Sequence, residues 1–136
     1  MMKIGAIIQA RMSSERLPGK VLQQIAGKPM LQYLLERLEH CEVLDGLVVA
    51  TSVDESDTPI TSFCQRYGVS CYRGDLNNVA GRFNDVLDSY GFDAFVRING
   101  DSPLLDQRLV DKAVELFKQH EADLATNALV RSYPKG

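Results

Sequence analysis

Residues 9–20, Gln-Ala-Arg-Met-Ser-Ser-Glu-Arg-Leu-Pro-Gly-Lys, contain side chains suited to binding a polyanion. Three cations lie in this short stretch, namely Arg11, Arg16 and Lys20. The stretch follows the apolar run 4–8, which has the composition of a buried strand. Loops after the strands of open α/β sheets bind ligands, and guanidinium and ammonium groups pair with phosphate. The pattern predicts a loop that holds a nucleoside triphosphate, with Gly19 allowing close backbone approach and with Arg11 and Lys20 neutralising charge.

A second polar motif, Arg97-Ile98-Asn99-Gly100-Asp101-Ser102-Pro103-Leu104, lies at the end of the predicted strand 93–98. In a doubly wound sheet of order 3-2-1-4, the first and fourth strands are neighbours, and their ends flank the ligand crevice. Asp101 would then place a carboxylate for Mg²⁺ opposite the cations of the 9–20 loop, which is the arrangement of a nucleotidyl-transfer site. The alternative for both motifs is a solvated turn or a helix cap.

A third candidate is Arg82, which lies in the first turns of a helix that follows Asn77 and Asn78. Either asparagine could cap that helix. Arg82 could point into the same crevice, and its alternative is a solvated surface charge. The chain has no Walker motif, because Leu22 stands where the first glycine belongs and Pro29 where the magnesium-binding hydroxyl belongs.

Other chemistries have no support in the pattern. No G-x-G-x-x-G fingerprint follows the first apolar run, and the two histidines form no metal or catalytic pattern. The three cysteines are odd in number and form no C-x-x-C pair, which predicts reduced thiols in or near the core: Cys41, Cys64 and Cys71.

The bulk composition is that of an ordinary globular protein. The chain has 136 residues, 45% hydrophobic and 24% charged, which fits one domain with its own core. A net charge of −3 argues against nucleic-acid or membrane partners and makes the cations of the 9–20 loop a local feature. No apolar run approaches the roughly 18 residues of a membrane helix, and the start is too short for a secretory signal. We therefore expect a cytoplasmic protein.

Apolar and amphipathic segments alternate along the whole chain. Strands are predicted at 3–9, 46–52, 69–73, 93–98 and 123–127, and helices at 29–40, 56–67, 78–91 and 107–119. Gly68 and Gly91 stand where helix C-caps are expected. Strict alternation predicts an α/β fold with a parallel sheet and right-handed crossovers.

Residues 6–22, followed by Gly27-Lys28-Pro29-Met30, resemble the opening of the cytidylyltransferases that make CMP-activated acidic sugars. The resemblance is strongest to the spore coat polysaccharide biosynthesis group, and extends to the 3-deoxy-manno-octulosonate and acylneuraminate cytidylyltransferases. It covers the whole chain, through 99–104 to 127–136. It implies a three-layer, Rossmann-like, mostly parallel sheet of the nucleotide-diphospho-sugar transferase type, of which residues 1–136 are the N-terminal, nucleotide-binding portion.

The resemblance also implies roles for individual residues. Arg11 and Lys20 would bind the CTP phosphates and act in catalysis, and Asp101 would hold the metal, Mg²⁺. The remaining nucleotide contacts that it implies are Ala6, Ala10, Gly19, Arg82 and Asn99. The segment 79–81, Val-Ala-Gly, replaces a Ser-Gly-Thr type sequence of the family, which leaves the contacts around Arg82 open.

Relatives of this kind run well beyond 136 residues. Their distal part completes the sugar pocket, adds an acidic metal ligand and often forms a homodimer contact. The expected activity is transfer of CMP from CTP to an acidic or modified sugar, with release of pyrophosphate. Without a distal part we expect weak nucleotide binding and poor or no catalysis. The alternatives are a different base specificity and a non-catalytic nucleotide-binding module.

Overall fold

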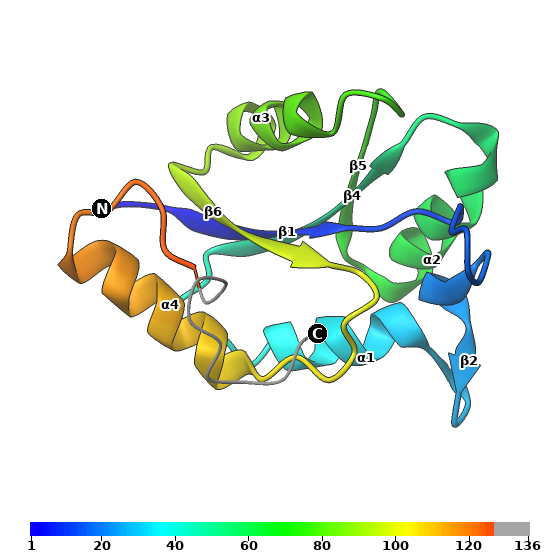
Figure 1. Cartoon of the computed structure of the whole chain (residues 1–136), viewed down its shortest axis with the longest axis horizontal. Coiled ribbons are helices and arrows are strands. Elements are labelled where there is room, and N and C mark those ends of the chain that lie inside the picture. Colours follow the sequence, from blue (N-terminus) through cyan, green and yellow to red (C-terminus); the bar gives the residue numbers. More distant parts are fainter. Residues whose placement is uncertain (127–136) are drawn as a thin grey trace.

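The computed structural model describes residues 1–126, and a four-stranded sheet forms its centre. The strands are β1 (Ile4–Gln9), β4 (Gly46–Ser52), β5 (Ser70–Gly74) and β6 (Ala94–Asn99). They lie in the order β5-β4-β1-β6, and every neighbouring pair is parallel. The predicted strand order is therefore confirmed, and the ends of β1 and β6 are adjacent (Figure 1).

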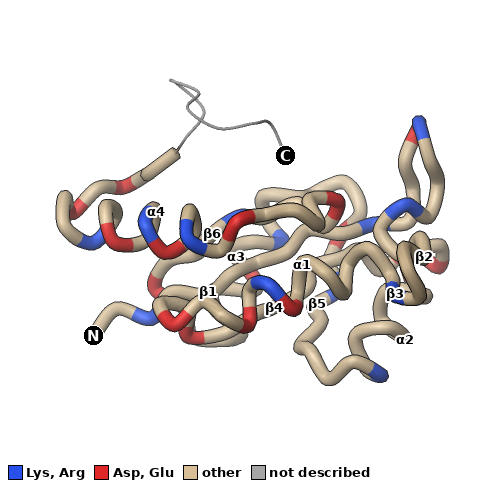
Figure 2. Tube along the Cα trace, turned by 90° about the horizontal axis from the view of Figure 1, so that it is seen from below, with Lys and Arg blue, Asp and Glu red and all other residues tan. Residues whose placement is uncertain are grey.

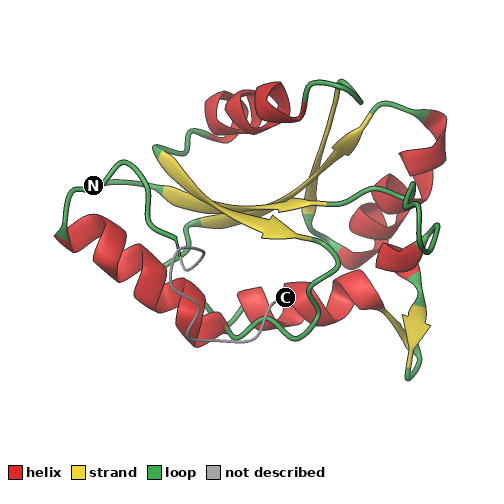
Figure 3. Ribbon diagram, viewed as in Figure 1, coloured by secondary structure: helices red, strands yellow, loops and turns green. Residues whose placement is uncertain are grey.

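Helices cover both faces of this sheet and give three layers (Figure 3). On one face lie α1 (Met30–Leu38), α2 (Thr58–Tyr67) and α4 (Gln107–Gln119), and on the other lies α3 (Val79–Tyr90). Side chains alternate along β1, so that Ile8 packs in the core beneath α1 and α2 while Ile7 packs with Phe83 of α3. By the same alternation Gln9, the last residue of β1, faces the α3 side.

The helix termini agree with the sequence. Gly68 and Gly91 end α2 and α3 in the left-handed conformation, with φ of 92° and 69°. Of the two predicted caps for α3, the structure selects Asn78, whose side chain accepts a hydrogen bond from the Gly81 N–H at 2.9 Å. The second predicted helix is divided into the short 3-10 helix η2 (Glu55–Asp57) and α2.

Residues 24–29 form a small hairpin that the sequence did not indicate. Its strands are β2 (Gln24–Ile25) and β3 (Lys28–Pro29), and the 3-10 helix η1 (Lys20–Leu22) precedes them. Ala26 and Gly27 both have positive φ, 48° and 85°, as two-residue hairpin turns of type I′ require. The hairpin ends at Pro29, so α1 begins at Met30 rather than at the predicted residue 29.

The predicted strand at 123–127 is wrong for residues 123–126, which are not in a strand. The chain turns after α4 instead, because Glu121 has a φ of 48° and the Ala122 N–H bonds back to the Phe117 carbonyl at 3.3 Å. Leu124, the large apolar residue of this segment, is 77% exposed. Residue 127 and the rest of 127–136 lie outside the described residues.

Charges of both signs are interspersed along the described chain (Figure 2). None of the helices in residues 1–126 is long and apolar enough to cross a bilayer. Cys41 and Cys64 are buried, Cys71 is half-buried, and all three are free thiols, as predicted.

Candidate functional site

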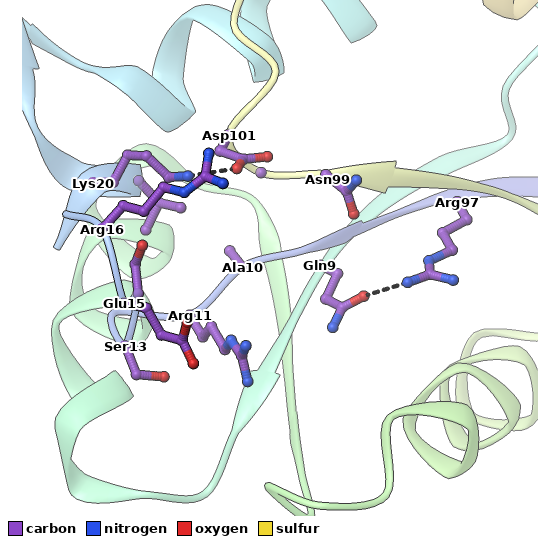
Figure 4. Close-up of a pocket in the computed structure, with 13 residues that line it drawn as sticks. Gln9, Ala10, Arg11, Ser13, Glu15, Arg16, Lys20, Arg97, Asn99 and Asp101 are labelled. Carbon is purple, nitrogen blue, oxygen red and sulfur yellow. Dashed lines mark hydrogen bonds and ion pairs between the residues drawn. The ribbon is translucent and has the colours of Figure 1, made fainter. Parts of the chain in front are cut away.

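A cleft of about 460 Å³ lies at the carboxyl ends of β1 and β6 (Figure 4). Four cationic and two acidic side chains line it: Arg11, Arg16, Lys20 and Arg97, with Glu15 and Asp101. The chain as a whole carries a net charge of −3, so the cationic excess here is local. A concave site of this sign attracts an anionic ligand.

The cleft has two lips: residues 10–20, which follow β1, and residues 99–101 at the end of β6. These lips lie together because β1 and β6 are adjacent. Gln9 is in register with Asn99, and the Gly100 N–H donates to the Gln9 carbonyl at 2.8 Å. Arg97 lies on the same face two residues before Asn99; it donates to the Gln9 side-chain oxygen at 3.3 Å and covers the Phe83 ring at 5.4 Å. Amide and guanidinium groups therefore line the cleft on the face of the sheet that α3 covers.

Gly100 is required where the lips meet. A Cβ at this position would lie 3.0 Å from the Ala10 Cβ and 3.1 Å from the Gln9 carbonyl oxygen. We expect Gly100→Val to push the two loops apart and to lower the free energy of unfolding by about 1–3 kcal/mol, as overpacking does. Chemical denaturation measures this loss. Ser102→Ala serves as a control, and equal stability of the two variants would contradict the close approach.

The cation-rich loop is fixed at both ends by backbone hydrogen bonds. Gly19, with a φ of 74°, donates its N–H to the Met12 carbonyl at 2.7 Å. The Met12 N–H in turn donates to Oδ1 of Asp57, also at 2.7 Å. The residues between Met12 and Gly19 form a closed loop, and four of them line the cleft: Ser13, Ser14, Glu15 and Arg16.

Lys20 and Asp101 meet across the cleft. The Lys20 Nζ lies 2.7 Å from Oδ2 of Asp101, and the two side chains are 32% and 40% exposed. Arg11, Glu15 and Arg16 line the same cleft and are labelled in Figure 4. The structure therefore brings together the cations and the carboxylate that the sequence placed on two distant segments.

Arg82 is buried beside the cleft rather than exposed in it. It is 2% exposed, and its aliphatic stem packs on Gly74, where a Cβ would collide with it. Burial, the largest cause, lowers the pKa of Arg82; the Asp57 carboxylate opposes this shift and the Arg11 guanidinium adds to it. Within residues 1–126 neither Nε nor Nη1 of Arg82 has a hydrogen-bond partner.

The other predicted site residues occupy different positions relative to the cleft. Five of the predicted site residues line the cleft, namely Ala10, Arg11, Lys20, Asn99 and Asp101. Gly19 closes the loop without lining the cleft. The Ala6 side chain is fully buried in the core beneath α1 and α2, on the opposite face of the sheet from Arg97 and Asn99. A role for Ala6 beside cytosine stays a prediction.

The sequence analysis gave no role to three polar residues of this region, although Gln9 and Arg97 stand within the two motifs that it identified. Gln9 and Arg97 lie at strand ends, and a signal for Arg97 was available because it is two residues from Asn99 in a strand. Asp57 gave no signal, because its partner Met12 is 45 residues away.

Within the described part of the chain, no three His, Cys, Asp or Glu side chains form a group that could hold a metal ion by themselves. The cleft offers oxygen ligands from Asp101, Glu15 and Asn99. Mg²⁺ is commonly bound by one or two carboxylates together with substrate phosphates. The donor set therefore fits a hard cation that arrives with a phosphate ligand.

Comparison with known proteins gives the family. The family model described as cytidylyltransferase matches residues 5–133. The uncharacterized protein MJ1063 of Methanocaldococcus jannaschii is 41% identical, over 90% of this chain and 50% of its own length. SpsF, a spore coat polysaccharide biosynthesis protein of Bacillus subtilis, is 35% identical over 86% and 50%. The 3-deoxy-manno-octulosonate cytidylyltransferase of Geobacter sulfurreducens is 36% identical over 96% and 48%.

Solved structures agree with these relatives. A cytidylyltransferase from Leptospira borgpetersenii superimposes with a TM-score of 0.84 at 36% identity, covering 90% of this chain and 51% of that one. A CMP:2-keto-3-deoxy-manno-octonic acid synthetase complexed with CTP gives 0.78 at 28% identity, covering 88% and 49%. The chain thus spans about half the length of the relatives it matches. The family match over residues 5–133, together with relatives at 35–41% identity, establishes that this chain belongs to the cytidylyltransferase family.

Proposed function

We propose that this chain binds CTP in the cleft between residues 10–20 and Asp101, and that it takes part in transferring CMP to an acidic or modified sugar. The observation that carries the proposal is the 2.7 Å contact of Lys20 with Asp101 inside a cation-lined cleft. A nucleotidyl-transfer site needs cations for phosphates and a carboxylate for a metal within the span of one triphosphate. Both lie here at the ends of adjacent strands.

The closed loop and its cations would hold the triphosphate. Arg11 and Lys20 would neutralise phosphate oxygens, and Gly19 would let the backbone come close to them. Ala10 and Asn99, which both line the cleft, would border the cytosine. Arg82, whose buried Nε and Nη1 atoms have no hydrogen-bond partner within residues 1–126, would donate to the nucleotide on the α3 side.

Asp101 would hold Mg²⁺ together with phosphate oxygens. When bound, that ion supplies charge neutralisation and orients the phosphates. Lys20 now contacts the same carboxylate, so it must leave Asp101 when the triphosphate arrives. The negative charge of Asp101 would then be balanced by Lys20 before the nucleotide binds and by Mg²⁺ afterwards.

The proposed reaction is an in-line displacement at the α-phosphorus. A hydroxyl oxygen of the sugar forms the new P–O bond and loses its proton. The bond from the α-phosphorus to the bridging oxygen breaks, and pyrophosphate leaves with the electron pair. The chain's contribution is positioning and electrostatic stabilisation, with Arg11 and Lys20 sharing the charge that develops on pyrophosphate.

The relatives indicate the context for this reaction. One of them is named for spore coat polysaccharide biosynthesis and another for 3-deoxy-manno-octulosonate, so we propose a surface-glycan pathway in the cytoplasm and a sugar acid as acceptor. Because the chain spans about half of such relatives, a distal part would complete the acceptor site and a homodimer contact. A second candidate is a nucleotide-binding module without transfer activity, because the chain spans about half the length of the relatives named for transfer or biosynthesis.

Calorimetric titration of the chain with CTP, UTP, GTP and ATP, each with Mg²⁺, tests the proposal. We expect CTP to bind most tightly. A pyrophosphate-release assay with 3-deoxy-manno-octulosonate then separates the two candidates, because binding without release favours the module. If another nucleotide binds more tightly than CTP, the proposed base specificity is wrong. If none of the four nucleotides binds, the whole proposal is contradicted.

Lys20→Met removes one cation of the cleft and frees Asp101. We expect affinity for CTP with Mg²⁺ to fall by about 10- to 100-fold, since a charge-assisted phosphate contact is lost. Affinity for Mn²⁺ alone should rise, because no ammonium competes for the carboxylate. Titrations of both ligands measure these opposite changes. Lys112→Met, on the exposed side of α4, is the matched control, and equal CTP affinity in the two variants would remove Lys20 from the site.

A further inference from the structure

Asp57 is a completely buried carboxylate at the junction of η2 and α2. Its Oδ1 accepts the Met12 N–H at 2.7 Å, and its Oδ2 accepts the hydroxyl of Ser52, the last residue of β4. The Ser52 oxygen also accepts the Asp54 N–H at 3.1 Å. One carboxylate therefore connects the loop after β1, the end of β4 and the start of α2.

Met12 is the residue at which the cation-rich loop is fastened. Its N–H donates to Asp57, and its carbonyl accepts the Gly19 N–H at 2.7 Å. Both backbone groups of Met12 are thus committed, one to the body of the protein and one to closing the loop. The two backbone hydrogen bonds of Met12 therefore help to set the position of the loop and of Lys20 relative to Asp101.

The charge of Asp57 suits the same place. Asp57 and Arg11 act in opposite directions on the buried Arg82 guanidinium, so both lie within electrostatic reach of Arg82. A buried carboxylate near Arg82 offsets part of the repulsion that this guanidinium experiences from Arg11. An amide or apolar residue at position 57 would leave both cations to repel each other beside the cleft.

We propose that Asp57 is a positioning residue for the nucleotide site: it holds residues 10–20 in the conformation that receives a triphosphate, without touching the ligand. This inference rests on the proposed CTP site. The hydrogen bond between Asp57 and the Met12 N–H, which we call the clamp, is present without any ligand. Loss of the Asp57–Met12 bond would let the loop shift. Displacements of about 1 Å at a site of this kind reduce binding and rate by up to about 100-fold.

The test uses Asp57→Ala, Asp57→Asn and the control Asp54→Asn. Within residues 1–126 the Asp54 side chain accepts hydrogen bonds from Ser56 and none from the 10–20 loop. In the ligand-free chain, we expect Asp57→Ala to speed amide hydrogen exchange at Met12 and Gly19 by about tenfold, the value of a lost hydrogen bond. Asp57→Asn retains an oxygen that can accept the Met12 N–H, so its exchange should lie between that of wild type and that of Asp57→Ala.

Binding is measured with CTP and, as a probe free of any base, with inorganic tripolyphosphate. We expect Asp57→Ala to weaken both by about tenfold or more, Asp57→Asn less, and Asp54→Asn by less than about twofold. Unchanged exchange at Met12 would overturn the clamp. Faster exchange with unchanged binding would overturn its link to the site. Failure of the wild-type chain to bind either ligand would instead contradict the proposed function, while the exchange data still decide the clamp.

Ser52→Ala carries the test if Asp57→Ala does not fold. This substitution removes one hydrogen bond to Asp57 and leaves the carboxylate and the Met12 bond in place. We expect exchange at Met12 to rise by about threefold and the affinity for tripolyphosphate to fall by a similar factor. Wild-type values for both would overturn the inference.

Discussion

Asp101→Asn is expected to lower the affinity for CTP in the presence of Mg²⁺ by about 10- to 100-fold, the usual effect of losing a metal ligand or its support. Without divalent metal we expect the opposite sign. Asparagine carries no negative charge to repel the triphosphate, and Lys20 is no longer held at 2.7 Å by a carboxylate. Metal-free affinity should therefore rise or at least be retained.

Titration of CTP with Mg²⁺ and with a chelator measures both values in one protein. Asp88→Asn, an exposed carboxylate on α3, provides the matched loss of charge away from the cleft. A general change in net charge would act on both variants alike. If Asp101→Asn retains the wild-type dependence on Mg²⁺, Asp101 does not hold the metal.

Arg82→Met is expected to separate stability from binding. The guanidinium is 2% exposed, and its pKa is lowered first by burial, so its charge is costly in the unliganded protein. Because the cost of burying this guanidinium outweighs the opposing effect of the Asp57 carboxylate, we expect removal of the charge to raise the free energy of unfolding by about 1 kcal/mol. Affinity for CTP should fall by about tenfold or more, because two donors without protein partners are lost.

Denaturant unfolding and CTP titration together decide this prediction. Arg66→Met, which removes an exposed guanidinium near the end of α2, should change neither quantity by much. A structural role for Arg82 predicts the reverse pattern, with lower stability and little change in affinity. That outcome would remove Arg82 from the nucleotide site.

The central strands β1 and β4 could be predicted because they are apolar runs that are buried along most of their length. The runs 46–52 and 93–98 match β4 and β6 within one residue, and the strand order is that of the doubly wound sheet that we expected. The segment 123–127 fails because a short apolar stretch after a helix does not by itself distinguish a strand from a turn. The 24–29 hairpin was missed because Ala26 is an unusual residue for positive φ.

The candidate site was predictable as far as it depends on strand order. Lys20 and Asp101 are 81 residues apart, and adjacency of the first and fourth strands suffices to bring them together. The burial of Arg82 was not predictable, because the side chain of this α3 residue fits only where Gly74 of β5 has no Cβ. Asp57 was hidden for a similar reason: an aspartate before a helix is indistinguishable in sequence from an ordinary cap.

The most direct measurement is paramagnetic relaxation by Mn²⁺ added with CTP to the isotopically labelled chain. We expect the amide signals of Ala10, Lys20, Gly100 and Asp101 to broaden together when Mn²⁺ and CTP are both present. With Mn²⁺ alone, the same signals should broaden far less. Broadening centred elsewhere, for example on the groove formed by Leu22, Glu55 and Arg66, would contradict it. So would broadening of only one of the two lips.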